Sequence, residues 1–177
     1  VWKLVRRNVK PDSNEIKWNP LKNEINPKEI EGFDVIIHLG GAGIGDKRWT
    51  KKRKRLIKES REKTTILLSK TISNLENKPE IFVCASAIGI YGNRGDEELN
   101  EKSKPGEGFL TNVVSDWESH TNIAKNAGIR VVNIRTGIVL SATGGALKRM
   151  LLPWKLGAGG SIGGGKQWMS WISLDDQ

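Results

Sequence analysis

Apolar and polar positions follow one another in blocks that predict strands and helices in turn. Residues 34–39 form a continuous apolar run, the pattern of a strand buried on both faces. Residues 80–85 predict a second strand of this kind, and residues 130–135 a third, flanked by arginines. Between these strands, residues 50–75 and 111–125 place apolar side chains at three- and four-residue spacing, which predicts two helices.

Weaker patterns predict further elements toward both ends of the chain. Residues 2–6 alternate loosely and predict a strand that leads into Arg6 and Arg7. Residues 146–156 predict a short helix, and residues 167–174 predict a last strand. Strands that alternate with helices of this length indicate an α/β fold, a doubly wound parallel sheet with helices on both faces.

Ligands of such folds bind beyond the carboxyl ends of the parallel strands. Four segments of this chain directly follow a predicted strand and are therefore candidates for ligand contacts. They are Arg6–Arg7, Leu39–Gly45, Ala85–Tyr91 and Arg135–Val139.

The composition bounds the class of protein. With 177 residues, 37% of them hydrophobic and 28% charged, the chain is long enough for one domain with its own core. It holds no apolar run near the roughly 18 to 20 residues of a membrane helix and no secretory start, so we expect no membrane partner. The lone Cys84 cannot form an internal disulfide, which fits a reducing, cytoplasmic location. The chain opens within a predicted strand and lacks an initiator Met, so we expect upstream sequence.

The net charge of +9 predicts attraction to phosphates. Seven of the nine residues from Lys47 to Arg55 are Lys or Arg, a pattern with two interpretations. One is a nucleic-acid patch, in which only Trp49 would offer base stacking. The other, which we favour, is the solvated start of a helix in a protein without a nucleic-acid partner. The excess charge also suits a protein that holds a phosphate-rich cofactor.

Two glycine-rich loops are candidates for ligand contacts. Gly40–Gly45 lies between a strand and a helix, where backbone N–H groups can approach a phosphate. Its spacing does not meet the G-x-G-x-x-G fingerprint, and no acidic residue ends the next strand. The loop therefore either borders a cofactor or forms a plain tight turn. Gly157–Gly165 holds six glycines, and we interpret it as a substrate-side loop rather than a connector.

Three polar side chains end predicted strands. Arg6 and Arg7 stand where an acidic residue would hold a ribose 2′-hydroxyl and where arginine accommodates a 2′-phosphate. Two ordinary surface arginines are the alternative. Ser86 is placed either to hydrogen-bond a substrate oxygen or to cap the backbone.

Metal and hydrolase chemistry are not supported by the residue pattern. His38, His120 and Cys84 show no metal-ligand spacing. Residues 159–163 satisfy the letters of the G-x-S-x-G nucleophile elbow, but no predicted strand enters them and no helix leaves them. We therefore predict neither a metal site nor a Ser-His-Asp triad.

Taken in order, several motifs resemble the YfcH-like epimerases, a branch of the NAD(P)-dependent epimerase/dehydratase group and atypical extended short-chain dehydrogenases/reductases. The resemblance covers essentially the whole chain, and the Gln167–Trp171 run is quite specific. The motifs are Val35–Ala42, Asp46–Thr50, Glu59–Arg61, Ala85–Gly92, Gly106–Leu110, Asp116–Glu118, Arg135–Leu140, Gly144–Leu147, Gly165–Ile172 and Asp175–Asp176.

This resemblance implies a Rossmann-type fold that is truncated at both ends. Residues 1–143 would form a partial NADP-binding domain whose first strand and glycine-rich turn precede Val1, and residues 144–177 would begin a small substrate lobe. Trp18 would lie near the adenine, and the paired arginines would favour NADP over NAD. The cofactor contacts that the resemblance implies are Arg6, Arg7, Trp18, Leu39, Gly40, Gly41, Ala42, Ser60, Ala85, Ser86, Ala87, Gly137 and Ile138.

One departure from the wider superfamily concerns the catalytic Tyr-x-x-x-Lys pair, whose two places hold Leu110 and Val114. Ser86 remains a candidate for orienting a carbonyl, and Tyr91 and Glu107 are candidates for the proton donor. The resemblance implies an NADP-dependent oxidoreductase or epimerase that acts on a small carbonyl or nucleotide-sugar-like substrate. The alternative is a non-enzymatic NADP-binding sensor or interaction module that has lost the Tyr-Lys pair.

Overall fold

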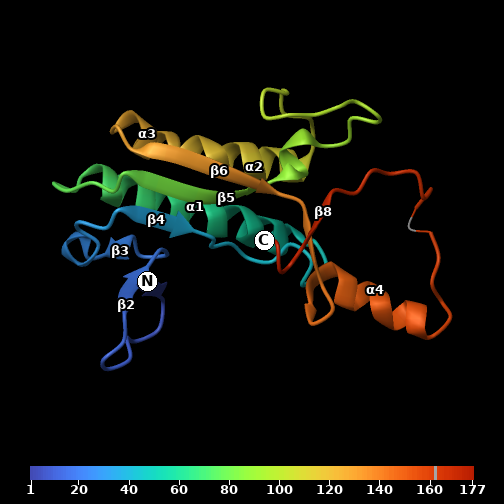
Figure 1. Ribbon diagram of the computed structural model, residues 1–177, viewed down its shortest axis with the longest axis horizontal. Coiled ribbons are helices and arrows are strands. Elements are labelled where there is room, and N and C mark those ends of the chain that lie inside the picture. The colour runs from blue at the N-terminus through green and yellow to red at the C-terminus, as the bar shows by residue number, and fades with distance from the viewer. Residues whose placement is uncertain (162) are drawn as a thin grey trace. The chain divides into compact units, whose positions relative to one another are not determined.

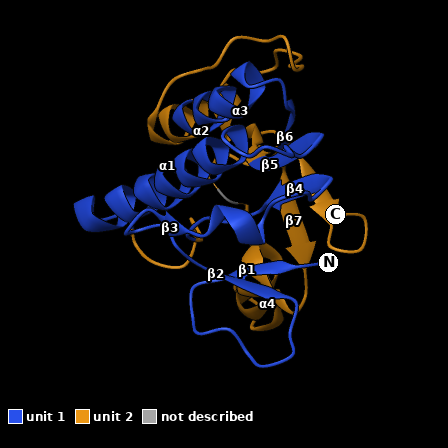
Figure 2. Cartoon of the chain, turned by 90° about the vertical axis from the view of Figure 1, so that its left-hand side faces the viewer, with its two compact units in different colours: residues 1–42, 49–85, 116–134 blue, residues 43–48, 86–115, 135–177 orange. Residues whose placement is uncertain are grey.

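The computed structural model describes residues 1–161 and 163–177, which form two compact units (Figure 1 and Figure 2). β5, α2 and β6 each run from one unit into the other along the chain. The first unit comprises residues 1–42, 49–85 and 116–134, and the second comprises residues 43–48, 86–115 and 135–177.

Three short strands form one sheet of the first unit. β1 (Lys3–Val5) pairs in parallel with β2 (Glu15–Asn19), and β3 (Glu24–Ile25) pairs with β2 in the antiparallel sense. Ile16 and Trp18 are both buried, because alternate side chains share one face of a strand and this face of β2 is covered. The strand expected over residues 2–6 is present as β1, and the antiparallel β3 is an addition.

A second sheet carries most of the candidate ligand segments, with its strands in the order β4, β5, β6. After a 3-10 turn, η1 (Pro27–Glu29), the chain forms β4 (Val35–His38), which is parallel to β5 (Ile81–Ala87). β6 (Arg130–Thr136) pairs with the other edge of β5. Since β4 and β5 run in the same direction, their carboxyl ends meet at one edge of the sheet, as predicted.

A long helix, α1 (Lys51–Ser73), connects β4 to β5. Thr50 caps its start, where the side-chain oxygen accepts a hydrogen bond from the N–H of Arg53. No helix among the described residues, α1 included, is both long and apolar enough to cross a membrane. The face that α1 buries consists of Ile57, Thr65, Leu67, Leu68, Ser69 and Ile72.

The helix expected over residues 111–125 is divided into α2 (Phe109–His120) and α3 (Asn122–Asn126). Thr121 lies between them, and its hydroxyl donates to the carbonyl of Glu118 at 2.7 Å. A threonine that bonds to the preceding turn competes with the backbone hydrogen bonds of the helix, which accounts for the break.

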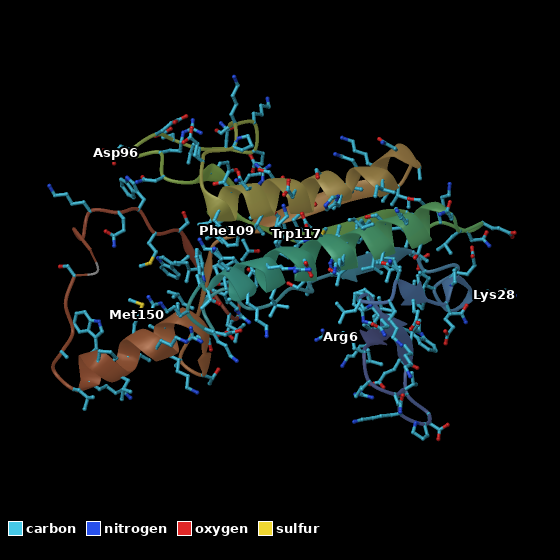
Figure 3. All side chains as sticks on the ribbon, turned by 180° about the vertical axis from the view of Figure 1, so that it is seen from behind. Arg6, Lys28, Asp96, Phe109, Trp117 and Met150 are labelled. Atoms are coloured by element: carbon cyan, nitrogen blue, oxygen red, sulfur yellow. The ribbon has the colours of Figure 1, made fainter. Side chains whose placement is uncertain are left out.

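The core of the first unit lies between the helices and one face of the second sheet. Phe82 and Cys84 of β5 are fully buried. Trp117 of α2 (Figure 3) enters the same cluster. Its Nε1 donates to Oγ1 of Thr65 at 2.9 Å. Burial raises the pKa of the Cys84 thiol to about 12, so this cysteine stays protonated and unreactive.

The prediction that β4 is buried on both faces is wrong. Ile36 packs against the core and His38 is buried, but Val35, Ile37 and Leu39 on the opposite face are 43%, 62% and 72% exposed. α1 and α3 lie on the core side of the sheet, and no helix of the first unit covers the other side within the described residues (Figure 1). An apolar run indicates that both faces of a strand are hydrophobic. Burial of both faces also requires a layer of secondary structure against each of them.

The second unit contains a 3-10 turn, η2 (Ile88–Tyr91), and a small sheet in which β7 (Ile138–Ser141) is parallel to β8 (Trp171–Ser173). α4 (Gly145–Lys155) follows β7 where a short helix was expected, and none of its residues is buried. The predicted last strand is shorter than expected, because residues 171–173 alone pair with β7.

Candidate functional site

The turn that follows β4 begins beside a buried histidine whose ring is held at both nitrogens. Nδ1 of His38 accepts a hydrogen bond from the N–H of Gly40 at 3.4 Å, and Nε2 lies 3.0 Å from Oγ1 of Thr64. The Thr64 hydroxyl donates to the carbonyl of Ser60 at 2.8 Å, which assigns the imidazole proton to Nε2. Burial lowers the pKa of His38 to about 4, so the ring is neutral at pH 7.

Helix α1 holds the end of the same turn through two side chains. Oγ of Ser60 accepts from the N–H of Ala42 at 3.0 Å and donates to the carbonyl of Ile57 at 3.1 Å. Nη1 of Arg61 donates to the carbonyls of Ala42 and Ile57, both at 3.0 Å. Both backbone polar groups of Ala42 are therefore tied to α1, which restricts the conformation of the turn.

Arg61 also lies directly against Gly41. A Cβ atom at position 41 would come within 3.1 Å of Cζ of Arg61, so the absence of a side chain allows this approach. The guanidinium faces the ring of Trp117, with Cζ 5.0 Å from the ring centroid. Burial, and then the charge of Arg53, lowers the pKa of Arg61.

The two arginines after β1 have different surroundings. Arg7 forms a two-pronged ion pair with Glu15, which lowers the pKa of this carboxyl to about 2. Arg6 is exposed at the end of β1 (Figure 3), and it forms no hydrogen bond or ion pair within the described residues. Of the predicted pair, Arg6 is therefore the arginine that is open to an added phosphate.

Trp18, expected near an adenine, belongs to the core of the first unit and is 9% exposed. Its ring meets the imidazole of His38 edge-on, with the ring centroids 6.4 Å apart. The contact links β2 to the end of β4, so Trp18 supports the residue that begins the turn.

The end of β5 carries three predicted cofactor residues. Ala85, in the first unit, is half-buried and packs against the core. Ser86, in the second unit, is 5% exposed, because the strand alternation places it on the same face as Phe82 and Cys84. Ala87 follows with an extended backbone directly before η2.

The hydroxyl of Tyr91, a predicted proton donor, has two hydrogen-bond partners. It donates to the carbonyl of Asn100 at 3.0 Å and accepts from Nη1 of Arg135 at 3.0 Å. Because a phenol has a single proton, Tyr91 must leave the Asn100 carbonyl before it can donate to a ligand. Glu107, the other candidate, is exposed.

Gly137 and Ile138 lie where the small sheet of the second unit begins. The N–H of Ile138 donates to the carbonyl of Ser170 at 2.9 Å. A Cβ atom on Gly137 would lie 2.7 Å from the same oxygen, so this close approach requires glycine. Of the predicted Gly157–Gly165 loop, Ile162 lies outside the described residues, and the substrate-side role of the loop remains a prediction.

The sequence predicted Gly40–Ala42 and Ser60 as cofactor contacts, whereas the contacts of His38, Thr64 and Arg61 with this turn were not predicted. A signal was present, because Ser60 and Arg61 lie four and three positions before Thr64 on one predicted helix, and each of these spacings places two side chains on the same face. Arg135 was predicted only as the last residue of a strand, and its hydrogen bond to the Tyr91 hydroxyl was not predicted. Within the described residues, no cluster of three or more His, Cys, Asp or Glu side chains is placed to hold a metal ion.

No family model matches this chain, but curated proteins do. The chain is 38% identical over all 177 residues to an epimerase family protein of Mycobacterium bovis, of which it covers 58%. It is 39% identical over 150 residues, 84% of the chain, to the epimerase family protein YfhF of Bacillus subtilis, of which it covers 49%. The chain thus spans about half the length of these curated relatives.

Solved structures confirm the predicted Rossmann-type α/β fold, of which this chain forms a part. A nucleoside-diphosphate sugar epimerase from Corynebacterium glutamicum superposes with a TM-score of 0.81 at 40% identity, over 99% of this chain and 36% of that one. The human epimerase family protein SDR39U1, solved with NADPH, superposes with a TM-score of 0.81 at 32% identity, over 98% of this chain and 57% of that one.

Proposed function

Because this chain belongs to the epimerase family, we propose that it binds NADP beyond the carboxyl ends of its parallel strands and acts on a small carbonyl or nucleotide-sugar-like substrate. In this proposal, residues 1–143 belong to the cofactor domain and residues 144–177 begin the substrate lobe. The activity belongs to the whole protein, of which this chain is a part by comparison with its relatives.

One observation supports the cofactor site above all others: the turn after β4 is held at both of its ends by hydrogen bonds within the chain. His38 fixes its start, and Ser60 and Arg61 fix its end. The turn lies at the carboxyl end of a parallel strand, where ligands of this fold bind. A turn that is already ordered binds a ligand without the entropy loss of ordering it.

The preference for NADP over NAD rests on Arg6. Its guanidinium is exposed and uncommitted to any described residue, whereas Arg7 is paired with Glu15. The planar guanidinium group presents several N–H donors side by side, which can hydrogen-bond to the oxygens of a 2′-phosphate. The human relative that was solved with NADPH is consistent with this assignment.

Bound NADPH supplies a hydride, and the residues of this chain would orient the group that receives it. In the proposal, the Ser86 hydroxyl donates a hydrogen bond to the substrate carbonyl oxygen as negative charge develops there. Ala87, Gly137 and Ile138 would line the nicotinamide end. Tyr91 would supply the proton once its hydroxyl has left the Asn100 carbonyl.

A second candidate function is an NADP-binding sensor without catalysis. Leu110 and Val114 stand where the wider superfamily has its tyrosine and lysine. The Tyr91 hydroxyl is also engaged on both sides, by Asn100 and Arg135. Both observations favour a site that kept the cofactor and lost the proton relay.

The test is a tryptophan-fluorescence titration of the full-length protein with NADPH and NADH, followed by turnover assays on carbonyls and nucleotide sugars. Arg6→Gln is expected to weaken NADPH binding about tenfold and to leave NADH within about twofold. Lys22→Gln, which removes an exposed charge from a turn, is the matched control. A wild-type protein that binds neither nucleotide refutes the proposal.

Turnover separates the two functions. Ser86→Ala is expected to lower kcat at least about tenfold and to change the Kd of NADPH by much less, because the lost hydrogen bond acts mainly on the reacting carbonyl. Tight NADPH binding without turnover of any substrate tested would instead establish the sensor.

A further inference from the structure

Residues 92–106 of the second unit form a compact loop whose two ends lie together, an Ω-loop. A Cβ atom on Gly92 would lie 3.0 Å from the carbonyl oxygen of Glu107, so the backbones at the two ends are in close contact. The N–H of Gly106 donates to the carbonyl of Ile90 at 3.0 Å and closes the base of the loop. Gly92 has a φ of 65°, a backbone conformation that glycine adopts more readily than residues with a side chain.

Hydrogen bonds among its own residues keep the Ω-loop in shape. The guanidinium of Arg94 donates to the Glu97 carboxylate at 2.6 and 2.8 Å and to the carbonyl of Lys104 at 3.0 Å. The N–H of Asn100 donates to the Ser103 hydroxyl at 3.0 Å, and the N–H of Ser103 donates to the carbonyl of Asn100 at 3.0 Å. Because Arg94 connects the start of the loop to its end, a displacement of one part carries the other with it.

One part of the Ω-loop engages the hydroxyl of the candidate proton donor. The carbonyl of Asn100 accepts from the Tyr91 hydroxyl at 3.0 Å. Nη1 of Arg135 donates to the Tyr91 hydroxyl at 3.0 Å and to the carbonyl of Glu101 in the loop at 3.3 Å. The phenol has a single proton, so this proton is withheld from a ligand for as long as the loop keeps its position.

Another part of the Ω-loop is fastened to the segment that precedes β8. Nε1 of Trp168 donates to Oδ1 of Asp96 at 2.7 Å, although Trp168 is 79% exposed. None of residues 92–106, all of which the structure describes, is buried. Exposed hydrogen bonds stabilise a loop far less than a buried apolar face does, so an open form is expected at on the order of 0.1–10% of molecules.

We propose that the Ω-loop is a gate on the candidate site, which opens when Trp168 releases Asp96 and whose opening frees the Tyr91 hydroxyl. Gly92 at the base of the loop absorbs the change in backbone direction. A ligand that contacts the indole ring or the phenol in the open form shifts the equilibrium toward that form. Asp96 and Trp168 are positioning residues in this scheme. The opening is a property of the chain itself, and the use of the freed proton rests on the proposed function.

The experiment measures how fast N-acetylimidazole acetylates the Tyr91 hydroxyl in the full-length protein without ligand, followed by mass spectrometry of the peptide that contains Tyr91. Acetylation requires a free hydroxyl, so its rate reports the open fraction. Trp168→Phe removes the N–H donor and Asp96→Ala removes the acceptor, and each is expected to speed the reaction about three- to tenfold. Asp96→Asn keeps an oxygen acceptor and is expected to stay within about twofold of wild type.

Two controls separate gating from a general loss of structure. Trp171→Phe changes another exposed tryptophan of the same unit, on β8, and should leave the acetylation rate within about twofold. The unfolding temperature of each variant should stay within about 2 °C of wild type, because the broken contact is exposed. An unchanged rate in either Trp168→Phe or Asp96→Ala overturns the proposal. So does a wild-type rate close to that of N-acetyltyrosinamide, because the loop would then not withhold the hydroxyl.

The gate and the proposed function fail separately. A wild-type protein that binds neither nucleotide refutes the proposed function and leaves the acetylation rates, which are measured without ligand, as a test of the gate. Acetylation rates that the variants do not change refute the gate and leave nucleotide binding as it is. Tyr91→Phe is expected to lower kcat at least about a hundredfold, and an unchanged kcat refutes the use of the freed proton.

Discussion

Buried polar side chains decide how the turn after β4 is built. His38 is neutral, with its Nδ1 accepting from Gly40 and its Nε2 bonded to Thr64. Gly40 follows His38 by two positions, whereas Thr64 lies 26 positions away on helix α1. The imidazole thus joins strand, turn and helix, and its charge state matters for stability.

His38→Gln is expected to flatten the pH dependence of stability in the acid range. The folded pKa of His38 is about 4 and the ordinary value is 6.5, so between these values the unfolded state binds more protons. The contribution of His38 is therefore complete above pH 6.5 and is lost as the pH falls toward 4, up to about 3 kcal/mol. Urea unfolding at pH 7 and pH 4.5 measures the effect. Equal losses in wild type and variant would contradict it.

A close backbone approach makes Gly106 the most restrictive glycine of the second unit. A Cβ atom at this position would overlap the carbonyl of Tyr91, and the N–H of Gly106 donates to the carbonyl of Ile90 at 3.0 Å. Gly106→Ala is expected to destabilise the protein by about 1–3 kcal/mol or more, because backbone must move. Gly160→Ala, with open space around it, is the control and should stay within about 0.5 kcal/mol in thermal unfolding.

Helices α1 and α2 are joined by one buried hydrogen bond as well as by apolar packing. Nε1 of Trp117 donates to Oγ1 of Thr65, and Thr65 is fully buried. An amphipathic pattern predicts that each helix buries one face. It does not predict that Trp117 and Thr65 lie opposite each other, because that depends on how the two helices pack. The pairing also sets the ring on which Arg61 lies.

Trp117→Phe is expected to destabilise the protein by about 1–3 kcal/mol, because the Thr65 hydroxyl loses a buried partner. In the Thr65→Val background the same substitution should be milder, since no polar group is then left unpaired. A double-mutant cycle by chemical denaturation measures the coupling between the two side chains. Strictly additive effects would show that the hydrogen bond contributes nothing beyond packing.

Taken as a whole, the chain presents an apolar sheet face that no described helix of the first unit covers. Val35 and Ile37 on β4, Leu39 directly after it and Ile134 on β6 are all exposed. Exposed apolar surface that is contiguous promotes association with other apolar groups. Adjacent residues of β4 provide a direct test, because they point to opposite faces.

Ile36→Thr is expected to destabilise the 177-residue chain by about 1–3 kcal/mol, because Ile36 packs against the core. Ile37→Thr should change stability by less than about 0.5 kcal/mol and should lower both self-association and the binding of an apolar dye. Thermal unfolding and sedimentation measure the two effects. The opposite ranking of the two variants would refute the assignment of the faces.

Much of the fold could be predicted from local pattern alone. The three- and four-residue spacing of apolar side chains located α1, and the apolar runs located β4, β5 and β6, because these signals reside in neighbouring residues. Glycine spacing and the end of a strand located the Gly40–Ala42 turn. The antiparallel β3 was not predicted, because a strand of two residues has no detectable periodicity. The break at Thr121 was not predicted, because it depends on one side-chain hydrogen bond.

The amino-acid order alone therefore established the class of fold, most of its elements and the segments that end its strands, since periodicity and chain-breaking residues act over a few positions. Folding in three dimensions settled which of those residues meet. Thr64 meets His38 from 26 positions along the chain, and Arg61 meets Ala42 from 19 positions away. Arg7 pairs with Glu15, although its side chain stays exposed. It also settled which strand face is covered. Such contacts depend on the packing of distant segments, which no local pattern encodes.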